Sequence, residues 1–158
     1  MKNLSLFYFL LVCIGLESCN KNSKTVDNQL LEKPESVQCY QALYETDTID
    51  LKINTFKNGK ISGDMEMKFL NMPIKFGKIA GKFRGDTLFA DYTFIQGTNG
   101  KVTFKNPIAL LKTREKLILG NGQIETYLGA SYFVKGKPID FENVKFKFAN
   151  VDCKKNSK

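Results

Sequence analysis

The sequence predicts an all-β protein with one domain, a single antiparallel up-and-down barrel or strongly curved meander of about eight strands. Polar and apolar residues alternate along one segment after another, as in Thr48–Asn54, which is typical of half-buried strands. Turn-forming residues such as Asn58 and Gly59 separate these segments, and no long segment has the apolar period of a helix. Closing the sheet would remove exposed strand edges, and a β-sandwich is the alternative.

The first half of the domain is a series of hairpins. A strand over residues 61–69 alternates strictly between apolar and polar side chains. The alternation then changes phase, which suggests a β-bulge near Gly77. Turns at residues 85–86 and 97–100 bound a strand over residues 87–96 that is rich in β-forming side chains.

The second half is less regular. Pro107 lacks a backbone donor and therefore indicates an edge position or a bulge. The glycines of residues 120–122 are expected to bend a strand or to split it in two. The remaining strands are expected over residues 101–111, 117–127, 131–135 and 141–148.

The N-terminus has the parts of a secretory signal. Lys2 supplies an early charge, and an uncharged, mostly apolar stretch follows from Leu4 to Leu16. As a helix this stretch would reach roughly 20 Å, which is short of a hydrocarbon core of about 30 Å. A processed signal is therefore favoured over a permanent membrane helix.

Residues Leu16, Glu17, Ser18 and Cys19 resemble the lipobox of bacterial lipoproteins, with an aliphatic residue, a small residue and then cysteine. The resemblance implies cleavage after residues 1–18 and acylation of Cys19, with chains such as palmitate holding the protein on a membrane. Glu17 departs from the small residue usual in enterobacterial examples, but lipoproteins of the Bacteroidota tolerate more variety there. The alternative is an ordinary signal with an incidental cysteine.

These boundaries divide the mature chain into three parts. Residues 19–38 carry the lipid and form a polar, flexible tether, because they have too few apolar side chains to pack. Residues 39–153 form the β-barrel-like domain, and residues 154–158 form a basic tail. No acidic residue lies in residues 20–24, which by resemblance to Bacteroidota lipoproteins implies a periplasm-facing position in the cell envelope, on a membrane such as the outer membrane.

Two cysteines are left for a disulfide. Cys13 leaves with the signal and Cys19 takes the lipid, so Cys39 and Cys153 can pair in a compartment that permits disulfides. A bridge would close a loop of about 115 residues, worth roughly 4–5 kcal/mol in the chain-entropy model. It would place the first and last strands side by side. The alternative is two buried free thiols.

A second resemblance lies inside the domain. Residues Gly81–Phe94 are similar to a segment that recurs in small lipoproteins of the Bacteroidota. The resemblance implies the same kind of secreted β-domain. It carries no known active site, so no functional residue is transferred.

The residue inventory argues against an enzyme. The chain has no histidine, which excludes Ser-His-Asp and Cys-His catalysis and the usual histidine metal sites. No metal or other cofactor is expected. Asp91 and Glu125 lie in predicted strands near tyrosines, and a carboxylate-dependent periplasmic hydrolase using such a pair is the alternative. An alternating strand, however, would point Asp91 into solvent.

The leading hypothesis is a non-enzymatic envelope lipoprotein that binds an apolar small ligand or an envelope partner. Phenylalanine and methionine suit an adaptable apolar cavity, although an eight-stranded barrel can also be filled by its own side chains. The expected lining residues are Met65, Met67, Phe69, Phe94, Phe104, Phe146 and Phe148.

The net charge of +8 favours anionic partners. Nucleic acid is discounted because an exported lipoprotein rarely meets it. A further alternative is docking to anionic glycolipid, which requires a set of cations to share one face. That set is Lys75, Lys78, Lys82, Arg84, Lys145 and Lys147.

Overall fold

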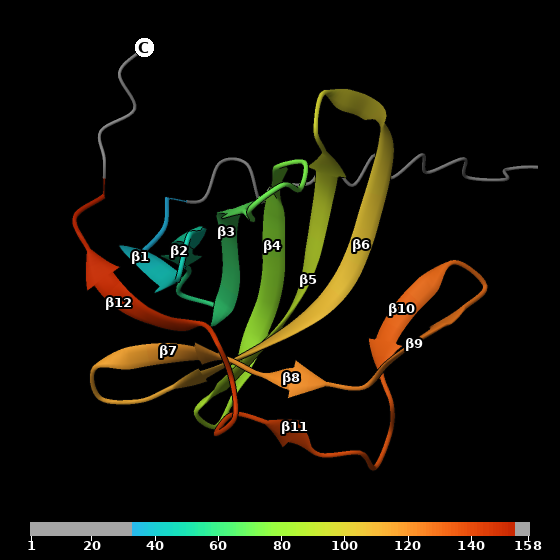
Figure 1. The fold of residues 1–158 in the computed structure, drawn as a ribbon. Helices are drawn as coiled ribbons and strands as arrows, with labels where there is room; N and C mark the ends of the chain where they lie inside the picture. Colours follow the sequence, from blue (N-terminus) through green and yellow to red (C-terminus); the bar gives the residue numbers. More distant parts are fainter. Residues whose placement is uncertain (1–32, 154–158) are drawn as a thin grey trace, which may run out of the picture. The chain divides into compact units, whose positions relative to one another are not determined.

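The computed structural model of this protein describes residues 33–153 (Figure 1). The expected signal peptide, Cys19, the first part of the tether and the basic tail lie outside these residues. The strands are β1 (Ser36–Tyr44), β2 (Asp47–Thr55), β3 (Lys60–Lys68), β4 (Lys75–Arg84), β5 (Thr87–Gln96), β6 (Asn99–Lys112), β7 (Lys116–Leu119), β8 (Asn121–Gly122), β9 (Ile124–Tyr127), β10 (Ala130–Phe133), β11 (Ile139–Asp140) and β12 (Lys147–Val151).

Eight of these strands form a closed antiparallel barrel, which confirms the predicted fold class. The order around the barrel is β1-β12-β7-β6-β5-β4-β3-β2, so consecutive strands are neighbours as far as β7. The chain then leaves the barrel for two small sheets, β9 with β10 and β8 with β11, before β12 closes the ring against β1. The up-and-down path is thus interrupted once.

Local sequence signals set the hairpins as expected. Gly59, Gly85 and Gly97 have φ values of 73°, 59° and 64°, in the left-handed region that glycine adopts without strain. Each glycine lies in the turn between two paired strands. β1 begins at Ser36, before the domain start expected at Cys39.

The expected bulge near Gly77 is wrong. The register runs without a shift through Gly77, which pairs with Met65 on one side and with Phe94 on the other. A Cβ on Gly77 would lie 2.1 Å from the carbonyl oxygen of Thr93, so only glycine permits this close approach of the strands. The irregular register lies instead between Phe94 and Gln96, where β5 pairs with β6.

The expectations for Pro107 and for residues 120–122 are confirmed. Pro107 pairs with Asp91 of β5, while β7 pairs with β6 only from Leu110 to Lys112. Proline therefore lies where β6 has a strand on one side alone, and no ladder donor is lost on the other. The chain breaks at Gly120 into β7 and β8, as the glycines suggested.

The last strand begins later than expected, at Lys147 and not at residue 141. The Asp140 carboxylate accepts hydrogen bonds from the backbone N–H groups of Glu142 and Asn143, at 2.8 and 3.1 Å. Such local bonds hold the chain in a turn and compete with strand pairing. The alternating pattern of residues 141–146 therefore does not form a strand.

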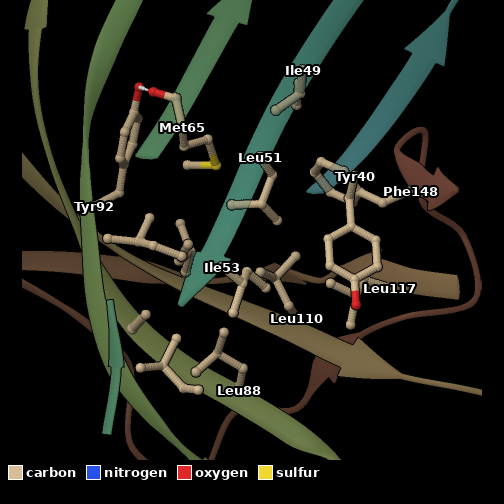
Figure 2. Close-up of a cluster of buried hydrophobic side chains, with 14 of the residues drawn as sticks. Tyr40, Ile49, Leu51, Ile53, Met65, Leu88, Tyr92, Leu110, Leu117 and Phe148 are labelled. Atoms are coloured by element: carbon tan, nitrogen blue, oxygen red, sulfur yellow. Dashed lines mark hydrogen bonds between the residues drawn. The ribbon is translucent and has the colours of Figure 1, made fainter. Parts of the chain in front are cut away.

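Apolar side chains fill the barrel (Figure 2). In the described part of the chain no polar or charged residue is buried. The Tyr92 hydroxyl donates a hydrogen bond of 3.0 Å to the carbonyl oxygen of Met65, which satisfies the one polar end of that buried ring. The largest fully buried side chains are Tyr92, Phe148, Ile49, Met65, Ile79, Leu88, Leu110 and Leu117.

The predicted disulfide between Cys39 and Cys153 is present, with a Cα–Cα distance of 5.1 Å. It lies beside the seam that closes the barrel, where β1 and β12 share three residue pairs, from Cys39–Val151 to Gln41–Ala149. The bridge spans 114 positions of the sequence. It therefore constrains nearly the whole folded domain in the unfolded state.

Reduction of the disulfide should destabilise the domain. Opening a loop of this length is expected to lower the free energy of unfolding by about 2–5 kcal/mol. Urea unfolding followed by circular dichroism, with and without reductant, measures the change. The double variant Cys39→Ser/Cys153→Ser should match the reduced protein and should not respond to reductant. An unchanged midpoint on reduction would show that the bridge does not stabilise the seam.

Tyr92 should make the stability fall at alkaline pH. Burial, assisted by the Glu66 carboxylate, raises the pKa of Tyr92, so the folded protein keeps a neutral phenol where the unfolded chain ionises. The resulting stability is complete below about pH 10, and it is lost as pH rises towards the higher folded pKa.

Urea unfolding between pH 8 and pH 11 tests this dependence. Tyr92→Phe should be less stable near pH 8 by about 1 kcal/mol, because the Met65 carbonyl loses its donor. Its stability should fall less steeply above pH 10 than that of the wild type. Tyr127→Phe, at an exposed position, should keep the wild-type slope. Parallel slopes for all three proteins would contradict the assignment.

Candidate functional site

Five aromatic side chains gather at one end of the barrel, where β3 leads into β4 and β5 leads into β6. We call this set the aromatic rim: Tyr44, Phe69, Phe94, Phe104 and Phe146. Phe69 stacks on Phe146 at 5.6 Å between ring centroids, and Tyr44 meets Phe146 edge-on at 6.1 Å. Phe94 stacks on Phe104 at 5.5 Å. These separations are typical of favourable aromatic pairs.

Strand ends bring the rim together. Tyr44 is the last residue of β1, Phe69 follows β3, and Phe146 precedes β12. In an antiparallel barrel these ends lie on the same side as the end of β5 and the start of β6. Phe94 and Phe104 are register partners on those two strands, so their rings share the inner face.

Two lysines lie over the rim. The Nζ atom of Lys75 is 5.8 Å from the centre of the Phe69 ring and 5.7 Å from that of the Phe94 ring. This ammonium therefore contacts both the Phe69–Phe146 stack and the Phe94–Phe104 stack. The Nζ atom of Lys145 lies 4.9 Å from the centre of the Tyr44 ring. A cation over an aromatic face is attracted by the ring quadrupole. Within residues 33–153 neither lysine has a carboxylate at ion-pair distance.

The rim therefore combines apolar faces with two cations that acidic side chains of the described chain do not neutralise. Phe104 is 43% exposed despite its stacking, and Phe69 and Phe146 are half-buried. Such an arrangement can hold an apolar group that carries an acidic substituent. The rings would contact the apolar part and the ammonium groups would attract the acid.

The expected lining residues do not surround one internal cavity. Four of them, Phe69, Phe94, Phe104 and Phe146, belong to the rim. Met67 is partly buried and packs against the core beside them. The other two, Met65 and Phe148, are fully buried in the packed interior.

Sequence reasoning did not assign Tyr44 or the two lysines to this site. Lys75 belongs to the set of cations considered for glycolipid docking, yet it occupies an inward position at the start of β4, in phase with Gly77 and Ile79. The alternation along β4 was the signal that could have placed Lys75 inward. The bulge expected near Gly77 hid this signal, because a bulge reverses the direction of the side chains before it.

A small pocket of about 240 Å³ lies at the opposite end of the barrel. Tyr40 contributes a hydroxyl that donates to Oε1 of Gln38 at 3.1 Å. Burial raises the pKa of Tyr40, with a smaller opposing effect from the Asn150 side chain, so the phenol is neutral at ordinary pH. The pocket is smaller than the roughly 300–1,000 Å³ typical of drug-sized ligand sites. Its lining is Ser36, Gln38, Tyr40, Ile53, Thr55, Phe83, Lys112 and Leu117.

The two acids considered for catalysis do not form a pair. Asp91 makes an ion pair of 2.8 Å with Lys105 of β6, on the outer surface of the barrel. Glu125 is exposed on β9. Over residues 33–153 no group of three or more acidic, cysteine or histidine side chains is placed to hold a metal ion.

The cations considered for glycolipid docking do not share one face. Lys78 and Lys82 lie on the outside of β4, and Lys78 forms an ion pair with Asp64. Lys147 belongs to β12, which is separated from β4 by three strands in either direction around the barrel. The condition for that alternative is therefore not met.

Comparisons of the chain with protein-family models, curated proteins and solved structures found no match. In the described part of the chain no helix could cross a membrane. The function proposed below therefore depends on the sequence signals and on the geometry of the barrel.

Proposed function

We propose that this protein is a non-enzymatic, membrane-anchored lipoprotein of the cell envelope that binds an envelope partner at the aromatic rim. The observation that carries the proposal is the placement of Lys75 between the Phe69 and Phe94 rings, with the neighbouring Phe104 ring partly open to solvent. Its partner presents an apolar segment with an acidic group. The lipobox supports anchoring through Cys19, facing the periplasm.

The filled interior favours recognition at the barrel end over enclosure of a small ligand. A side chain such as Met65 or Phe148 already occupies the volume that a ligand would take. A surface with a few aromatic rings and two cations suits a segment that a larger molecule presents, because the rest of that molecule needs no cavity. The filled interior therefore favours an envelope partner over a free apolar ligand.

Two matched dyes test the chemistry of the rim. Anilinonaphthalene sulfonate has an apolar body and an anionic group, and N-phenylnaphthylamine has nearly the same body without the charge. Both dyes should bind the wild type. Lys75→Met should weaken the sulfonate by roughly 2–5-fold, as loss of about 0.5–1 kcal/mol implies, and should leave the neutral dye unchanged.

Further variants locate the dye. Phe104→Ser should weaken both dyes, because it removes apolar surface and no charge. Lys78→Met is the matched control, since Lys78 lies on the outside of the same strand and pairs with Asp64. Fluorescence titration measures the affinities, and circular dichroism checks that each variant is folded. Equal affinities for all four proteins would place the dye elsewhere and contradict the proposal.

The anchor has its own test. Mass spectrometry of the protein purified from membranes should find an N-terminus at Cys19 that carries acyl chains. Cys19→Ala should abolish the lipid and should leave the Cys39–Cys153 bridge intact. A mature N-terminus without lipid would show that the signal is an ordinary one.

A further inference from the structure

The hairpin of β9 and β10 has an unusual residue at its tip. The two strands are joined by Leu128 and Gly129, with φ values of 49° and 80°. Positive φ at both central positions is the pattern of a tight type I′ turn, which favours asparagine, aspartate or glycine at the first of them. Leucine strains the backbone there, since its Cβ crowds the chain in the left-handed region. Asparagine would adopt this turn with less backbone strain.

Exposure makes this leucine more unusual. Leu128 is 89% exposed and Tyr127 is 66% exposed, the two highest values among the large apolar side chains of the described chain. Ile124 and Tyr132 on the same hairpin are also exposed. The hairpin lies outside the barrel, where β10 contacts β6, and its turn is directed away from the barrel (Figure 1). A strained, exposed apolar residue at a projecting tip indicates a contact made outside this fold.

We infer that this hairpin inserts its tip into the surface of a lipid bilayer. The order of side chains matches the change of polarity with depth in a membrane. Leu128 lies at the apex and Tyr127 is next to it, whereas the charged side chains of Glu125, Lys135 and Lys137 lie further from the apex. Leucine suits the acyl region, tyrosine suits the interface, and lysine suits the phosphate groups.

The dimensions agree with shallow insertion. Strands of four residues reach about 13 Å from the base to the apex, and interfacial helices bury their apolar face to a depth of about 5–10 Å. The stretch from Asn20 to Lys33 can span at most roughly 45–50 Å, which lets an anchored domain reach the surface. The reach depends on the proposed anchor at Cys19, and the net charge of +8 favours an anionic surface.

A single tryptophan can report the insertion, because the chain contains none. Leu128→Trp in the full mature protein, reconstituted through its own anchor into phosphatidylcholine and phosphatidylglycerol vesicles, places the only indole at the apex. Its emission should move to shorter wavelength, brominated acyl chains should quench it, and iodide should quench it several-fold less than in detergent-free buffer without vesicles.

The control is Leu43→Trp, since Leu43 is 65% exposed beside the β1–β2 turn. That indole should stay accessible to iodide on the same vesicles and should escape bromine quenching. Full iodide access at Trp-substituted position 128 would overturn the proposal, and so would equal protection at both positions. Protection at position 128 only after an envelope protein is added would also overturn it in favour of a protein pocket.

A second variant avoids any effect of the indole itself. Leu128→Asn suits the left-handed backbone and should keep the unfolding midpoint of the wild type. Amides of residues 124–133 should gain several-fold protection from hydrogen exchange on vesicles in the wild type, and this gain should be lost in the variant. The intact mass of the reconstituted protein reports the lipid on Cys19 separately, so failure of the anchor and failure of insertion are distinguishable.

Discussion

The closure of the barrel between β1 and β12 is the constraint on which the rest of the structure depends. Only three residue pairs join these strands, and the Cys39–Cys153 bridge lies beside them. Without this seam β1 and β12 would be edge strands, and the buried faces of Ala42 and Phe148 would be open to water. Disulfides form and persist mainly in oxidising compartments, so this seam would suit the export proposed above.

The strands β7 and β12, which complete the ring, are short, and this explains why apolar surface of β6 stays exposed. β7 and β12 have four and five residues, whereas β6 has fourteen. The first part of β6 therefore extends past its neighbour on one side, and Phe104 has a strand partner in β5 alone. The exposure of Phe104 is consistent with this mismatch in length.

Local signals predicted most of the architecture. The alternation of Thr48–Asn54 and the turn at Gly59 depend on neighbouring residues, so the sequence contains them directly. Gly77 shows the limit of prediction from local pattern. A β-bulge and an inward glycine at a close contact between strands both interrupt the apolar alternation in the same way, so the sequence does not distinguish them. The late start of β12 depends on the hydrogen bonds that the Asp140 carboxylate accepts, and the apolar alternation of the sequence does not predict these bonds.

The candidate site was harder to predict, because its residues come from the ends of six strands. The sequence indicated which phenylalanines face inward, but not that Met65 and Phe148 would fill the interior while Phe104 would stay open. The position of Lys75 over two rings depends on the loop after Phe69 and on the register of β4 with β5. Both are tertiary features.

The position of the rim on the barrel bears on how the proposed anchored molecule would work. β1 starts at Ser36 and reaches the rim at Tyr44, so its nine residues place the rim about 30 Å from the start of this strand. If Cys19 carries the proposed lipid and the tether is as flexible as its composition predicts, the anchor would limit only the distance of the domain from the membrane and not its orientation. A second contact through Leu128 would also fix the rotation of the barrel. With both contacts made, the rim would face a constant direction, and a partner would meet Lys75 and Phe104 without a search over orientations.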